Sequence, residues 1–175
     1  MHPTWGSGHT RTDWKKAATK AGNAILAENP NHLIIVEGLN YANNMSPIKD
    51  DPIQLDIANR LVYSFHFYSW EQKVAKTDSY DELRDDLDKH VAFMLEENQP
   101  YTAPLWLGEF GTNSESDYWK YLIQYLGERP QIGWAYWAYN GYKENKDDDE
   151  SFGLLEKDMK TVRHPWKLAA LQSIQ

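Results

Sequence analysis

Four short apolar runs, each preceded or followed by a helical pattern, constrain the fold of this 175-residue chain more than any other feature. The runs start at residues 33, 61, 105 and 132, and helical patterns cover 13–29, 79–98, 115–127 and 166–173. Strands that alternate with helices in this way indicate βα units and a parallel sheet. An eight-stranded βα barrel needs about 250 residues. We therefore predict an α/β fold: half of a TIM (β/α)₈ barrel, with four parallel βα units and a leading helix, as a single domain over residues 1–175.

Local signals set the expected limits of these elements. Thr12 or Asp13 can cap the first helix, and Ser79 with Glu82 has the spacing of a capping box for the longest one. The continuous apolar run Leu33–Val36 predicts a strand that is buried on both faces. The acidic stretch Lys143–Glu150 predicts a solvent-exposed loop, with calcium binding as a minor alternative.

Charge and cysteine content exclude several classes of protein. The formal net charge is −8 and the chain has no run of Lys and Arg, which argues against nucleic acid and against anionic membrane surfaces as partners. No apolar run approaches the roughly 20 residues of a membrane span, and no signal peptide is visible at Met1. The absence of cysteine excludes disulfides and thiol chemistry.

Aromatic content suggests the kind of ligand. The chain has eight Trp and eleven Tyr, whereas ordinary cores are built mainly from Leu, Ile and Val. Trp and Tyr rings stack on flat, partly polar molecules, and sugar rings are common ligands of that type. The alternative is a core that happens to be rich in tryptophan.

Unusual side chains follow all four predicted strands at their carboxyl ends. They are Glu37; His66 and Tyr68; Glu109; and Trp137, Tyr139 and Asn140. The carboxyl edge of a βα barrel is its catalytic face, so these side chains are expected to meet there. Taken one at a time, each has a structural alternative: a structural Glu109, a core histidine at His66 and a barrel-filling ring at Trp137.

Glycoside hydrolysis is the chemistry that this set suits. Glu109 can attack an anomeric carbon as a carboxylate nucleophile. His66 and Tyr68 can hydrogen-bond that carboxylate or the sugar hydroxyls, and Trp137 can form an apolar floor for a pyranose ring. We assign Glu109, His66 and Tyr68 to catalysis and Trp137, Asn140, Trp5 and Trp70 to substrate binding. No metal site is predicted.

Several motifs resemble the C-terminal half of glycoside hydrolase family 5, the cellulase family of retaining β-glycosidases. The matching pieces run through nearly all of the chain in the family's order: Thr4-Trp5-Gly6, Asn29-Pro30-Asn31 with Leu33–Gly38, Asn59–Ser64 running into His66-x-Tyr68, Leu107–Gly111, Trp134-x-Tyr136-Trp137 and Gly153-Leu154-Leu155. The resemblance implies that these are the fifth to eighth barrel strands. It also implies Glu109 as nucleophile, His66 and Tyr68 as hydrogen-bonding partners, Trp137 as the stacking platform, β-1,4-glucans or related β-glucans and mannans as substrates, and no cofactor.

One catalytic group of the family has no counterpart here. The general acid/base of the family is the Glu of an Asn-Glu-Pro motif on the fourth strand, and residues 1–175 contain no such motif. Retaining hydrolysis needs two carboxyl groups about 5–5.5 Å apart. Glu37 is the only other strand-end candidate, and the resemblance gives it no such role. The expected function is therefore β-1,4-glucan hydrolysis with the usual acid/base absent from the chain; the alternative is a non-catalytic carbohydrate-binding half-barrel.

A half-barrel leaves two strand edges and the inner face of its sheet uncovered. Pairing two copies about a twofold axis would close an eight-stranded barrel. We therefore expect a homodimer or a complex with a complementary half-barrel; a fragment of an ordinary full-length enzyme is the third reading. Secretion is expected from the polymeric substrates of the family.

Overall fold

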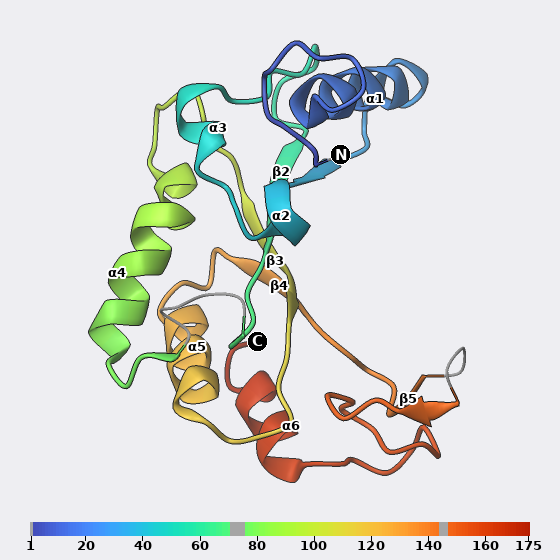
Figure 1. The fold of residues 1–175 in the computed structure, drawn as a ribbon, viewed down its shortest axis with the longest axis vertical. Coiled ribbons are helices and arrows are strands. Elements are labelled where there is room, and N and C mark those ends of the chain that lie inside the picture. The colour runs from blue at the N-terminus through green and yellow to red at the C-terminus, as the bar shows by residue number, and fades with distance from the viewer. Residues whose placement is uncertain (1, 71–75, 144–146) are drawn as a thin grey trace. The chain divides into compact units, whose positions relative to one another are not determined.

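The computed structural model describes residues 2–70, 76–143 and 147–175, and the chain falls into two compact units (Figure 1). Unit 1 comprises Met1–His66 and Leu87–Trp106, and unit 2 comprises Phe67–Asp86 and Leu107–Gln175. The single domain predicted over 1–175 stays a prediction.

Four strands pair in chain order, β1-β2-β3-β4. They are β1 (Ile34–Glu37), β2 (Leu61–His66), β3 (Leu105–Phe110) and β4 (Gly133–Tyr136). Strands β1 and β2 run parallel with Ile34 opposite Leu61 and Glu37 opposite Ser64. The four parallel strands predicted from the apolar runs are confirmed, each to within about one residue of its predicted start.

In unit 1, helix α1 (Trp14–Glu28) follows from its cap and its apolar stripe. The side chain of Asp13 accepts a hydrogen bond from the backbone N–H of Lys16, as predicted for an N-cap. Ala18, Gly22 and Leu26 are buried on one face. The short helices α2 (Leu39–Ala42) and α3 (Pro47–Asp50) follow β1. The core of this unit includes Val36, Met45, Ile48, Tyr63 and Phe65.

The prediction that Leu33–Val36 is buried on both faces is wrong. Ile34 and Val36 are buried, but Leu33 is 61% exposed and Ile35 is 56% exposed. A continuous apolar run indicates two covered faces only when both sides of the sheet have neighbours. Within the described residues, alternate side chains along this run therefore stay uncovered, although all of them are apolar.

The single helix predicted over 79–98 is also wrong in its second half. Helix α4 (Tyr80–His90) ends before Val91, whose backbone is not helical, and a 3-10 helix, η2 (Ala92–Leu95), follows. The backbone of Val91 leaves the helical region, and Phe93 and Met94 in the 3-10 turn that follows are both buried. Half of the predicted capping box forms, since Ser79 Oγ accepts from the N–H of Glu82 at 3.4 Å while the Glu82 carboxylate accepts from Thr77 Oγ1 at 2.5 Å.

In unit 2, helices α5 (Asp117–Gly127) and α6 (Pro165–Gln172) confirm two predicted helices, with Pro165 in the first turn of α6. An aromatic core connects the strands with these helices. Phe110 stacks on Trp119 with a centroid distance of 6.1 Å and meets Tyr136 edge-on at 5.5 Å. Trp119 is also in edge contact with Trp166. The alternative reading of a Trp-rich core thus holds for part of the aromatic content. None of the helices that the structure describes is long and apolar enough to cross a membrane.

The loop predicted over Lys143–Glu150 is wrong in part. Strands β5 (Tyr142–Lys143) and β6 (Asp148–Asp149) pair antiparallel, with residues 144–146 outside the described part. Arg163 stabilises this hairpin: its Nη2 lies 2.6 Å from Asp149 Oδ1 and its Nε lies 3.0 Å from Glu156 Oε2. The Arg163 side chain lowers the pKa of Asp149 by donating to the carboxylate. Partnered acidic side chains can therefore form a strand where composition indicated a loop.

Candidate active site

The end of β3 carries Glu109, and the strand departs from regular pairing just before it. Tyr63 N–H donates to Pro104 O, and Phe67 N–H donates to Glu109 O. Between these two hydrogen bonds, β2 advances by four residues and β3 by five. Strand β3 therefore contains one extra residue, which forms a bulge. The alternation of buried and less buried residues along β3 also breaks here: Leu107 and Phe110 are buried, whereas Gly108 and Glu109 between them are not. This bulge turns Glu109 away from the helix-covered face that Phe110 occupies.

Tyr68 contacts the Glu109 carboxylate directly. Its hydroxyl donates to Glu109 Oε2 at 3.1 Å, and both residues belong to unit 2. Tyr68 itself is buried. A hydrogen bond to one carboxylate oxygen fixes the orientation of the group. This contact is one of the two predicted for Tyr68, the other being a hydrogen bond to sugar hydroxyls, and the catalytic roles of both residues stay predictions.

Aromatic side chains extend from Tyr68 toward solvent. Trp70 stacks on Tyr68 with a centroid distance of 4.4 Å and is 53% exposed. Phe152 lies 5.5 Å from Trp70 and 6.3 Å from Tyr68, again between centroids. Phe152 is thus a third ring beside Tyr68 and Trp70, two of the predicted site residues, and local sequence gave no reason to select it.

Trp137, the predicted stacking platform, directly follows β4. Its backbone N–H donates to Phe110 O at 2.9 Å, and its side chain is 49% exposed. The Trp137–Ala138 peptide bond is cis. A Cβ at Gly111 would collide with the carbonyl oxygen of Trp137, so the glycine after Glu109 allows this close backbone approach. Asn140, also predicted to bind substrate, is exposed and donates from Nδ2 to Tyr142 O at 2.5 Å.

A return segment, residues 150–155, lies along the chain that follows Trp137. Leu154 N–H donates to Ala138 O at 2.9 Å and Leu155 N–H donates to Tyr139 O at 3.1 Å. From α6, Lys167 Nζ donates to Phe152 O at 3.0 Å. Burial lowers the pKa of Lys167 to about 8, with Arg163 adding to the shift and Glu150 opposing it.

His66 and Glu37 lie in unit 1 and contact each other. His66 Nε2 is 3.5 Å from Glu37 Oε1, with the Glu37 side chain 54% exposed and the His66 side chain 12% exposed. Trp5 is also in this unit, where its Nε1 donates to Asp51 O at 2.7 Å. The polar edge of Trp5 is thus used by the fold, while its ring is half-buried.

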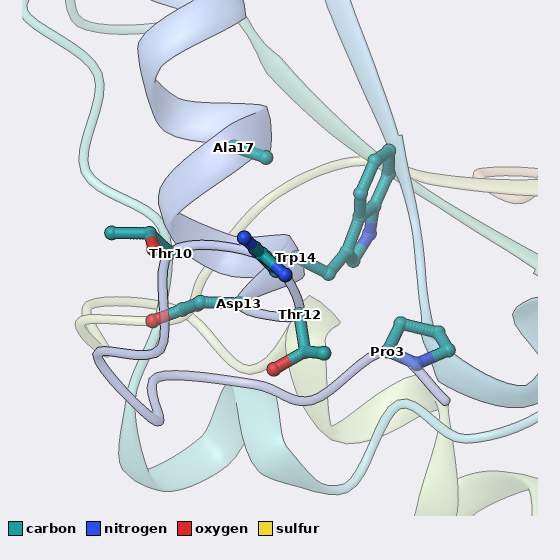
Figure 2. Close-up of a pocket in the computed structure, with 7 residues that line it drawn as sticks. Pro3, Thr10, Thr12, Asp13, Trp14 and Ala17 are labelled. Atoms are coloured by element: carbon teal, nitrogen blue, oxygen red, sulfur yellow. The ribbon is translucent and has the colours of Figure 1, made fainter. Parts of the chain in front are cut away.

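A pocket of about 220 Å³ lies at the start of α1 in unit 1, lined by Pro3, Thr10, Arg11, Thr12, Asp13, Trp14 and Ala17 (Figure 2). Figure 2 shows Trp14 and Pro3 on one side of it and Thr10 on the other. The Asp13 carboxylate accepts from the backbone N–H groups of Lys16, Gly6 and Gly8, and the Lys16 bond is the main reason why the pKa of Asp13 is lowered. Its polar atoms therefore fix the N-terminal segment, and no predicted site residue lines the pocket.

Sequence reasoning missed Phe152 and Lys167. A lysine inside a short helix is normally solvent-exposed, so nothing in the sequence marks Lys167 as buried. Phe152 directly precedes the Gly153-Leu154-Leu155 motif, which is the only local sign of its position. Within residues 2–70, 76–143 and 147–175, no three His, Asp or Glu side chains are grouped so as to hold a metal ion.

Comparison with known proteins identifies the family of this chain. The family model described as cellulase (glycosyl hydrolase family 5) matches residues 1–143. An endoglucanase of Paenibacillus polymyxa is 30% identical over 93% of this chain and 44% of its own length. The major extracellular endoglucanase of Xanthomonas campestris pv. campestris is 26% identical over 98% of this chain and 37% of its own length. This chain thus spans less than half of either relative.

Solved structures show the same relation. An endocellulase variant from Pyrococcus horikoshii in complex with cellotetraose is 26% identical and superimposes with a TM-score of 0.79, over 99% of this chain and 51% of that protein. The catalytic domain of the Xanthomonas endoglucanase gives a TM-score of 0.78 at 27% identity, over 99% and 53%. This chain covers about half of each of these solved structures, which is consistent with the predicted half-barrel. The chain belongs to the cellulase family, glycosyl hydrolase family 5.

Proposed function

We propose that this chain carries the nucleophile half of a β-1,4-glucan hydrolase, with Glu109 as the nucleophile. The observation that supports this role most directly is the hydrogen bond from Tyr68 to Glu109 Oε2 at 3.1 Å. Family membership and the endoglucanase names of the relatives give the substrate class. The structure of the Pyrococcus relative with cellotetraose supports an oligosaccharide of the same type as ligand.

In the proposed mechanism, a Glu109 oxygen attacks the anomeric carbon while the bond from that carbon to the leaving-group oxygen breaks. Tyr68 donates to the other carboxylate oxygen and holds the attacking one in line. A separate acid gives its proton to the leaving oxygen. Water then attacks the glycosyl ester, the same group takes the proton of this water, and Glu109 is released as a carboxylate.

The acid/base is proposed to come from outside residues 1–175. Glu37 is a poor candidate because its carboxylate is 54% exposed and lies against His66, whereas a general acid needs an environment that keeps its proton. The missing group would be supplied by a complementary half-barrel, by a second copy of this chain, or by a longer chain of which these residues are part. Light scattering coupled to size-exclusion chromatography distinguishes a dimer from a monomer.

An activated substrate tests Glu109 without the missing acid. A dinitrophenyl β-cellobioside has a leaving group that needs no protonation, and fluorine in place of the hydroxyl next to the anomeric carbon slows hydrolysis of the covalent intermediate. We expect intact-mass measurement to show one cellobiosyl group per chain, attached at Glu109. The Glu109→Gln variant keeps the shape of the side chain and should remain unlabelled. Labelling of the variant would exclude Glu109 as the nucleophile.

A carbohydrate-binding protein without turnover is the second candidate. The exposed rings of Trp70 and Trp137 favour it, since they can stack on a sugar whether or not a second carboxyl group is present. Cellotetraose titrated into the chain would then bind equally well to Glu109→Gln and to the native protein, and the activated substrate would label neither. Secretion is proposed as well, because the Xanthomonas relative is named an extracellular endoglucanase.

A further inference from the structure

Lys167 lies in α6 of unit 2, and its side chain is fully buried, which is unusual for a lysine. Its Nζ donates to two adjacent backbone carbonyls, Phe152 O at 3.0 Å and Gly153 O at 3.3 Å. The same nitrogen lies 5.3 Å from the centroid of the Tyr136 ring. Burying an amine costs free energy unless its donors find acceptors, and here two carbonyls accept from it.

The backbone that Lys167 contacts is fixed from other directions too. Tyr136 Oη donates to Phe152 O at 2.7 Å, so this one carbonyl accepts from two side chains. A Cβ at Gly153 would lie 2.6 Å from Gly141 Cα and 2.7 Å from Asn140 O, which leaves no space for a larger residue. The position of Phe152 is therefore set by its own carbonyl and by the tightly packed residue after it.

From this backbone, the Phe152 ring reaches the aromatic side chains beside Glu109. It lies 5.5 Å from Trp70 and 6.3 Å from Tyr68, and Tyr68 donates to Glu109. We propose that Lys167 is a positioning residue for the sugar-binding surface next to Glu109: by holding the carbonyls of Phe152 and Gly153, it keeps the Phe152 ring against Trp70 and Tyr68. This inference rests on the proposed function for the role of that surface.

A purely structural role for this side chain would be served as well by an apolar one. Methionine has a similar volume, adds no desolvation cost and fills the same space between Tyr136 and Trp166. An amine instead gives directed hydrogen bonds to two successive carbonyls, which fixes the rotation of the segment as well as its distance. The two roles therefore predict different results for K167M: unchanged aromatic geometry in one case and a displaced Phe152 in the other.

The test is the indole N–H resonance of Trp70 in the full chain, assigned by comparison with W70F. This resonance depends on the Phe152 and Tyr68 rings around it, and it is recorded without any substrate. We expect K167M to move it by several line widths while the Trp5 and Trp14 resonances stay in place. The matched control is K160M, because Lys160 is an exposed lysine of the same unit. F152L, which keeps both carbonyls, should move the Trp70 resonance as K167M does.

Chemical rescue separates the amine from the volume of the side chain. The chain contains no cysteine, so K167C, alkylated while unfolded and then refolded, is modified at one place. Bromoethylamine gives a lysine analogue with sulfur in the chain and should restore the native Trp70 resonance; bromopropane gives a neutral chain of equal length and should not. Equal spectra for the two products would overturn the proposal, as would a Trp70 resonance that neither K167M nor F152L moves.

Cellotetraose titration adds a functional readout. Loss of one positioned ring contact predicts binding about threefold to tenfold weaker in K167M and in F152L, with K160M unchanged. If the native chain binds no cellotetraose, the proposed function fails, whereas the Trp70 resonance still decides the role of Lys167. If K167M does not fold but F152L does, the Trp70 resonance of F152L decides whether the Phe152 ring is part of the sugar-binding surface. The two alkylated products of K167C then decide whether the amine holds that ring in place.

Discussion

Two strand-end glutamates in this chain begin from nearly the same local sequence and reach different surroundings. Glu37 ends β1 and is followed by Gly38, while Glu109 lies near the end of β3, with Gly111 two residues later. The Glu37 side chain is 54% exposed and lies 3.5 Å from His66. Glu109 is half-buried, accepts from Tyr68 at 3.1 Å and follows a bulge in its strand.

The difference shows what converts a carboxylate at a strand end into a candidate nucleophile. A donor on one carboxylate oxygen fixes the other oxygen in direction, and nearby rings exclude water from one side. In unit 2 the buried Tyr68 provides the donor, and Trp70 and Phe152 pack beside that tyrosine. Glu37 has His66 as its neighbour at 3.5 Å, and its side chain is 54% exposed. Substitutions at matched positions test whether this difference has consequences.

The largest effect is expected for the pair E109Q and E37Q. Removing a covalent nucleophile lowers the rate of its step by roughly 10⁴-fold or more. E109Q should therefore abolish the initial release of dinitrophenolate from the activated cellobioside, measured by absorbance under single-turnover conditions. E37Q should leave that rate within about a factor of two. A comparable loss in both variants would show that the two glutamates act together.

The turn after Glu109 predicts a large effect on stability. In G111A the new methyl group would meet the carbonyl oxygen of Trp137, which is backbone and cannot rotate away. We expect a loss of about 2–4 kcal/mol in the free energy of unfolding, measured by urea denaturation. G127A is the control, because the nearest side chain there is 3.6 Å away and the residue ends α5. That variant should be neutral or more stable by a few tenths of a kcal/mol.

Removal of the Tyr68 hydroxyl should give an intermediate effect. A hydrogen bond to a charged group contributes about 1.5–3 kcal/mol, so Y68F should slow labelling by Glu109 about tenfold to a hundredfold. The Phe ring keeps its stacking on Trp70, so cellotetraose affinity should change little. Y80F is a suitable control, since the Tyr80 hydroxyl also donates to a glutamate, Glu128, and neither residue is a predicted site residue. Equal rates in Y68F and Y80F would contradict a role for the contact between Tyr68 and Glu109.

The smallest effect concerns pH and Lys167. Its pKa is lowered by burial from 10.5 to about 8, so between these two pH values the unfolded chain binds more protons than the folded one. The free energy of unfolding should therefore rise with pH across this window, by on the order of 1 kcal/mol. Arg163 keeps its charge throughout this window because its hydrogen bond to Asp149 raises its pKa, and His164 is already neutral because burial lowers its pKa. Denaturation of K167M over the same range should lack the rise.

Sequence reasoning succeeded where a signal is local. The cap at Asp13, the four apolar runs, Pro165 and the pairing of Tyr68 with Glu109 all follow from residue type and spacing. It failed where distant segments decide. Leu33 and Ile35 are exposed although they belong to a continuous apolar run, α4 ends before Val91, whose backbone is not helical, and β5 and β6 pair beside Arg163.

The sequence by itself determined that this chain is built from parallel βα units and placed Glu109, His66, Tyr68 and Trp137 at strand ends, because strand periodicity and turn residues act over a few positions. Only the tertiary structure decided which of two similar glutamates receives a donor and aromatic neighbours. It also showed that a lysine from the last helix holds the segment that carries Phe152. Contacts of this kind join residues far apart in the chain, and their energies depend on burial, which no local pattern specifies.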